Sequence, residues 1–198
     1  MRKNAKVMIG IFFLIVTSFV GVNFNSVFAV EELSIFDGRE NRNVRMCIPS
    51  DFGPAVGDSH VTITTIYPSM AAAPANGVIG NDRIRLNFLG RYRRGYGLEL
   101  SLINDPNAKL VGDAPVDGIR EFVLRAPQGG VTEYFAFKSS DGRNVLFVDG
   151  DANLAAFSYF TTFDSGVYVR GSVSKGINKN FRDLDVFIKN FVDKMICK

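Results

Sequence analysis

The chain has 198 residues, 46% of them hydrophobic, and its formal net charge is +3. The positive excess comes from residues 1–29, which hold three basic and no acidic side chains, so residues 30–198 carry 20 of each sign. The sequence pI of about 8.9 therefore gives no support for nucleic-acid binding, and a single histidine excludes metal centres built on several histidines.

Residues 1–29 have the three parts of a secretory signal peptide. Three basic residues precede an apolar stretch over 7–22, and Val27-Phe28-Ala29 has the small-x-small pattern of a cleavage site. The apolar stretch is shorter than the roughly 20 residues that a spanning helix needs. We therefore expect a single mature domain over 30–198, a periplasmic or secreted location, and no stable membrane insertion after cleavage.

The first part of the mature chain gives weak structural signals. Residues 30–57 are polar and are interrupted by Pro49, Gly53 and Pro54, which predicts an irregular segment. Alternation with period two begins at Val61 and predicts a strand. The stretch 68–80 is rich in Ala, Pro and Gly and is typical of a surface loop.

A hairpin centred on Arg93 is predicted next. Apolar and polar residues alternate over 84–88 and again over 98–102. Pairing the two runs places Phe88 opposite Leu98, with all the apolar side chains on one face, which is a consistent register.

Three more hairpins are predicted after the turn-rich stretch 104–118. Strand-like runs flank turn sequences at 127–130, at Asp141-Gly142 and at 164–166. The flanking runs are Ile119–Arg125, Val131–Lys138, Asn144–Asp149, Phe157–Phe163 and Val167–Val173. Strands that follow one another without helices between them predict an antiparallel meander.

The last element is different. Apolar residues recur over 181–196 at steps of three and four, which predicts an amphipathic helix with Asn178 or Asn180 as its cap. Its polar face has charges of both signs, which favours packing on a sheet over lying on a membrane. The predicted fold is mainly β, a curved antiparallel sheet, small barrel or sandwich, with one C-terminal amphipathic α-helix packed on it.

The two cysteines predict a disulfide. Cys47 and Cys197 form an even count in an exported chain, and no C-x-x-C motif is present. The bond would hold the C-terminal helix against the N-terminal segment.

The sequence contains no complete catalytic or metal-binding motif. There is no G-x-S-x-G, and the S-x-x-K pattern at 172–175 lacks its partner motifs. The stretch 149–153 begins like a calcium loop, but Leu154 and Phe160 occupy the positions of the required Gly and Glu. We therefore predict no catalytic residue, no metal site and no cofactor.

One local feature favours binding. Arg91, Tyr92, Arg93, Arg94 and Tyr96 lie at the tip of the predicted hairpin. Arginine offers forked donors to carboxylate or phosphate, and tyrosine offers flat faces for stacking. Arg83 and Arg85, on the polar face of the flanking strand, would widen this basic patch. The alternative is that turn tips are polar and that arginine only keeps the hairpin soluble.

Three functions are compatible with these observations. The first is an exported, non-catalytic module that recognises a protein or an acidic envelope component, but no nucleic acid, through the basic-aromatic hairpin tip. The second is an envelope hydrolase that uses His60 or a carboxylate pair. The carboxylates for such a pair would be drawn from Asp113, Asp117, Glu121 and Glu133. The third is a structural subunit of a secretion or surface assembly. The oligomeric state is left open.

Overall fold

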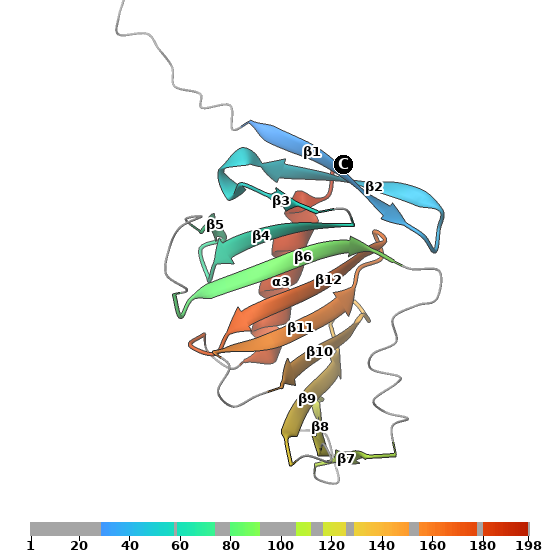
Figure 1. The fold of residues 1–198 in the computed structure, drawn as a ribbon, viewed down its shortest axis with the longest axis vertical. Coiled ribbons are helices and arrows are strands. Elements are labelled where there is room, and N and C mark those ends of the chain that lie inside the picture. Colours follow the sequence, from blue (N-terminus) through green and yellow to red (C-terminus); the bar gives the residue numbers. More distant parts are fainter. Residues whose placement is uncertain are drawn as a thin grey trace, which may run out of the picture.

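The computed structural model describes residues 29–57, 59–73, 80–91, 106–111, 117–125, 129–150, 155–177 and 180–197. They form two antiparallel sheets and one helix (Figure 1). The small sheet pairs β1 (Val30–Asp37) with β2 (Arg42–Pro49), and a 3₁₀ turn, η1 (Ser50–Phe52), follows it. The large sheet contains β3 (Ala55–Val56), β4 (His60–Ile66), β5 (Ala71–Ala72), β6 (Arg83–Gly90), β7 (Ala108–Leu110), β8 (Arg120–Arg125), β9 (Val131–Lys138), β10 (Asn144–Asp149), β11 (Ala156–Thr162) and β12 (Val167–Ser174). The helix is α3 (Phe181–Met195).

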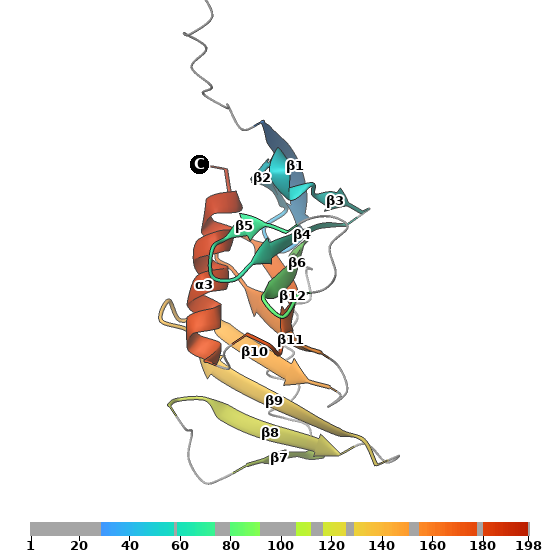
Figure 2. The ribbon, with the colours of Figure 1, turned by 90° about the vertical axis from the view of Figure 1, so that its left-hand side faces the viewer.

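The large sheet has ten strands, in the order β3-β4-β6-β12-β11-β10-β9-β8-β7, with β5 also paired to β4. Strands β8 to β12 form the predicted meander, and β7, which lies in the stretch predicted to be turn-rich, extends it by pairing with β8. β12 then pairs with β6, which joins the meander to the earlier strands. The prediction of a mainly β, antiparallel, curved sheet with a C-terminal helix is confirmed. The described strands do not close into a barrel (Figures 1 and 2).

The predicted pairing of the hairpin about Arg93 is wrong. β6 is a central strand, and Phe88 lies opposite Val61 of β4 on one side and Val169 of β12 on the other. Both edges of β6 are therefore occupied, and none remains for residues 98–102, which lie outside the described part of the chain. Alternation fixes the face on which each side chain lies, but it does not identify the neighbouring strand.

The N-terminal segment is also more regular than the sequence predicted. β1 and β2 pair over their full lengths, from Val30 opposite Pro49 to Asp37 opposite Arg42. The available signal was the alternation of Val44, Met46 and Ile48, which are buried in the structure. Pro49 ends β2 and does not interrupt it, so its presence is compatible with a strand.

Helix α3 covers one face of the large sheet (Figure 2). Its buried face includes Leu184, Ile188 and Phe191, and Phe181 packs against the rings of Phe147 and Phe157. Asn180 is the cap, since its side chain accepts from the backbone N–H groups of residues 182 and 183. The amphipathic pattern therefore reflects packing on the sheet.

The Cys47–Cys197 disulfide is present, as predicted. It joins β2 to the residues after α3, where Met46 also forms a β-bridge with Ile196 and the Cys197 N–H donates to the carbonyl of Arg45. No helix in the described part of the chain is long and apolar enough to cross a membrane. The signal-peptide prediction concerns residues 1–29, of which 1–28 lie outside the described part.

Candidate functional site

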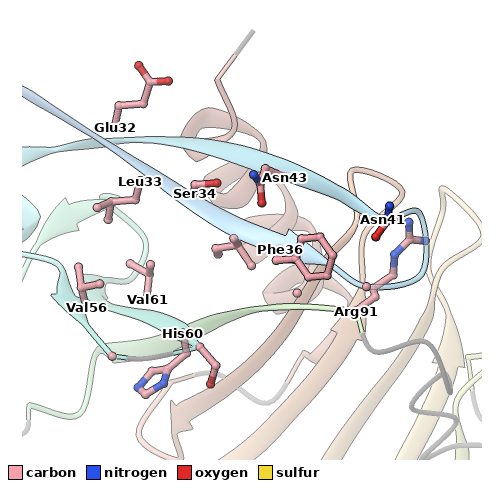
Figure 3. Close-up of a pocket in the computed structure, with 15 residues that line it drawn as sticks. Glu32, Leu33, Ser34, Phe36, Asn41, Asn43, Val56, His60, Val61 and Arg91 are labelled. Carbon is pink, nitrogen blue, oxygen red and sulfur yellow. The ribbon is translucent and has the colours of Figure 1, made fainter.

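A groove separates β1 from β3 and β4 (Figure 3). Among the described strands, β1 pairs only with β2, so its other edge faces this groove, whose volume is about 820 Å³. Leu33 and Phe36 of β1 lie on one wall, and Val56 and Val61 lie on the other. A cavity of this size with mainly apolar walls is typical of a binding site.

The two walls carry the most exposed large hydrophobic side chains among the described residues. Val56 is 62% exposed and Phe36 is 57% exposed. Phe36 lies on the outward face of β1 together with Glu32 and Ser34. The alternation would lead one to expect a polar residue at position 36 as well, but a phenylalanine stands there. Exposed apolar groups on both sides of a groove suit contact with a partner molecule.

The backbone of β1 adds a second means of recognition. An edge strand presents unpaired N–H and C=O groups, which can pair with an extended segment of another chain. If such a segment paired with β1 as a strand, its side chains would point alternately to its two faces. Every second side chain would then enter the groove. The arrangement can therefore bind a polypeptide through backbone pairing together with apolar contacts.

A buried ion pair fixes the end of this groove. The Arg91 guanidinium donates from Nη2 to Oδ2 of Asp37 at 2.6 Å and from Nε to both carboxylate oxygens at 3.2 Å. The Asp37 side chain is fully buried. Hydrogen bonding from Arg91 lowers the pKa of Asp37 below its ordinary value.

Two close approaches of backbone hold the ion pair in place. The Gly38 N–H donates to the Arg91 carbonyl at 2.7 Å. Gly166, at φ +98°, leaves room for the carboxylate, because a Cβ there would lie 2.3 Å from Oδ2 of Asp37. The end of β1, the end of β6 and the turn between β11 and β12 therefore meet at Asp37.

We expect Asp37→Asn to lower the free energy of unfolding by about 2 kcal/mol at neutral pH, because the charged partner of a buried hydrogen-bonded pair is lost. Since the folded-state pKa of Asp37 lies below its unfolded value, the carboxylate stabilises the fold above the unfolded pKa. That stabilisation is lost as pH falls through the folded pKa. Urea unfolding of both proteins across acidic pH checks this, and a difference that stays constant at low pH would contradict it.

The predicted site residues are only partly covered by the structure. Arg91 lines the end of the groove, and its side chain is 16% exposed and engaged by Asp37. Tyr92, Arg93, Arg94 and Tyr96 lie outside the described residues. Sequence reasoning missed Phe36, because it placed no strand at 30–57. It also missed Asp37, which is 54 positions from Arg91 and belongs to no local pattern.

The groove shows no catalytic arrangement among its described residues. His60 begins β4, one residue before the alternation that predicted this strand, and its ring lies against Gly57, where a Cβ would be 2.5 Å from Cε1. No carboxylate or hydroxyl in the described residues hydrogen-bonds to it. Glu32 is the single carboxylate on the described walls and pairs with Arg45 at 3.2 Å. The geometry therefore supports binding better than hydrolysis.

The other candidate residues lie away from the groove or outside the described chain. Glu121 and Glu133 belong to β8 and β9, far along the sheet, and Asp113 lies outside the described residues. Lys175 of the S-x-x-K pattern binds Asp149 at 2.7 Å. Within the part of the chain that the structure describes, no three His, Cys, Asp or Glu residues are grouped to hold a metal ion.

Comparison with known proteins gives one informative match. No protein-family model matches the chain, and no curated protein matches its sequence. The fold resembles the solved structure of an immunity protein of the Stenotrophomonas maltophilia type IV secretion system, with a TM-score of 0.57 and 12% sequence identity. The match covers 84% of this chain and 94% of that protein. At this identity, the likeness establishes a shared fold.

Proposed function

We propose that this chain is an exported, non-catalytic module that binds a protein and neutralises it, in the manner of an immunity protein. The groove between β1 and β3–β4 supports this most directly, because it joins a free strand edge to the exposed Phe36 and Val56. The fold shared with an immunity protein supports the same role.

The proposed location is periplasmic or secreted. The basic, apolar and small-residue parts of 1–29 support export, and the Cys47–Cys197 bond suits an oxidising compartment. Tyr92, Arg93, Arg94 and Tyr96 remain part of the proposed contact. They follow directly after Arg91, which lines the end of the groove.

The test is a crosslinking capture with oxidised 30–198, followed by affinity measurement with the captured protein. The variant F36S/V56S removes the apolar contacts and should weaken binding about tenfold or more. Val186→Ser is the matched control, since Val186 is 47% exposed on α3, away from the groove. Equal affinity of wild type and F36S/V56S would exclude the groove as the binding site.

The neutralising role has its own readout. Producing the captured protein in the compartment of its action should arrest growth, and co-production of this chain should restore growth. Co-production of F36S/V56S should fail to do so. A captured protein that harms no cell would argue against an immunity role while leaving a binding role in place.

A further inference from the structure

The pairing registers of the large sheet assign each side chain to one of its two faces. Consecutive residue pairs run without interruption between β4 and β6, and then through β12, β11, β10, β9 and β8. Because side chains alternate along a strand, these registers sort them between the face under α3 and the opposite face. We call the second the open face; several of its side chains are nevertheless buried, among them Leu146, Phe122 and Tyr168.

The open face is basic. Its strand positions include five basic residues and, among the described residues of these strands, no acidic one. The basic residues are Arg83, Arg85, Arg120, Lys138 and Arg170. Residues 30–198 carry equal numbers of basic and acidic side chains. The positive charge of this face therefore comes from the way these side chains are distributed between the two faces.

Arg85 and Arg170 lie on the neighbouring strands β6 and β12. Arg85 is opposite Ser172, two positions from Arg170, so the two arginines are diagonal neighbours on adjacent strands. Both are exposed, and neither forms an ion pair with a described carboxylate. The Arg170 guanidinium lies over the ring of Phe160, 5.8 Å from its centroid. Neighbouring cations repel each other, so placing the two arginines side by side has an electrostatic cost.

The basic residues are spread widely over this face. From Arg85 on β6 to Arg120 on β8 the sheet crosses five strand spacings, or roughly 24 Å at about 4.8 Å each. Leu146 of β10 lies between them on the same face and is 0% exposed. The basic residues therefore form two separate groups, Arg85 with Arg170 on β6 and β12, and Arg120 with Lys138 on β8 and β9.

The open face and the groove lie on the same side of the molecule. Figure 2 shows β3, which forms one groove wall, on the side of β4 opposite α3. The partner surface would therefore meet arginines along the sheet and the apolar Phe36 and Val56 at the groove. A protein offers both carboxylates and apolar side chains, whereas a nucleic-acid backbone presents phosphates throughout.

We propose that the open face binds a carboxylate-rich surface of the partner protein, with Arg85 and Arg170 as its main contacts. The inference rests on the proposed function, because it extends the same contact from the groove onto the sheet. Arginine forks suit carboxylates, and the Phe160 ring holds one of them in position.

Poly-L-glutamate provides a defined carboxylate probe for this face. Wild-type 30–198 should bind the labelled polymer in a fluorescence titration, and the affinity should fall with rising salt. R85E/R170E should weaken binding about tenfold or more. K109E/R125E is the matched control, because it changes the net charge equally at exposed positions on the other side of the sheet. This control should change the affinity less than about twofold.

Three results would overturn the proposal. Equal losses in the two variants would indicate a response to net charge alone, and no binding by wild type would remove the site. Tighter binding of a DNA oligonucleotide than of poly-L-glutamate would assign the face to nucleic acid. If R85E/R170E fails to fold, as seen by circular dichroism, R85Q/R170Q replaces it. F36S/V56S should still bind the polymer, which separates a failure of the groove from a failure of this face.

Discussion

Replacing both cysteines with serine is expected to lower the free energy of unfolding by about 5 kcal/mol, the value that chain entropy gives for a very long closed loop. Cys47 and Cys197 are 150 positions apart, so the bond constrains nearly the whole mature chain in the unfolded state. Domains of this size are stable by only about 5–15 kcal/mol in total. C47S/C197S should therefore unfold at much lower urea concentration than the oxidised protein.

Reduction of the wild type under the same conditions is the control, since it opens the same loop without changing the sequence. The two treatments should agree within about 1 kcal/mol. Binding at the groove should weaken too, because β2 positions β1 and is itself joined to the end of α3 by the disulfide. Equal urea midpoints for oxidised and reduced protein would show that the bond contributes little.

Local patterns predicted those elements whose partners are adjacent in sequence. The β9–β10 hairpin was predicted from Asp141-Gly142, and Gly142 has the positive φ that this turn requires. The β11–β12 hairpin and the capped helix were found in the same way. The pairing of β6 with β12 was missed, since Ile84 and Val173 are far apart and alternation does not choose between distant strands.

The candidate site depends on such distant contacts. The groove exists because the β1–β2 hairpin is held beside β4, and no residue pattern in 30–57 indicates that placement. Arg85 is the contrasting case: alternation alone assigned it to the polar face of its strand, where the structure places it. Sequence therefore predicted the face of a residue better than its partner.

A buried charged cluster lies between the sheet and α3, and no sequence pattern indicated it. Arg143, 7% exposed, donates from Nη2 to Oδ2 of Asp185 at 3.2 Å, and the Tyr159 hydroxyl donates to Oδ1 at 2.7 Å. Burial raises the pKa of Asp185 despite both partners. Burial would also raise the pKa of Asp141, but hydrogen bonds from Ser139 and Arg143 lower it to about 2.

Arg143→Met is expected to cost about 3 to 5 kcal/mol at neutral pH, because it leaves the Asp185 carboxylate buried without a cation. The pKa of Asp185 is higher in the folded than in the unfolded protein, so ionising this carboxyl destabilises the fold. The destabilisation develops as pH rises from the unfolded pKa to the folded pKa. Without Arg143 that pKa should rise further. The destabilisation measured in urea should therefore be smaller near pH 4 than near pH 7.

Removing the whole cluster separates charge from packing. The variant R143M/D185L/Y159F replaces Arg143, Asp185 and Tyr159 with apolar side chains of similar size, so the buried Asp185 carboxylate is no longer left without a cation. Only Asp141, whose side chain is 29% exposed, loses its cation, and the cost should fall below that of R143M alone. If the triple variant is destabilised as much as R143M, the loss comes from packing, because the Arg143 guanidinium also lies 4.3 Å from the centroid of the Phe163 ring. A triple variant with stability near wild type would mean that this cluster adds little net stability, as expected when the cost of burying charges offsets their attraction.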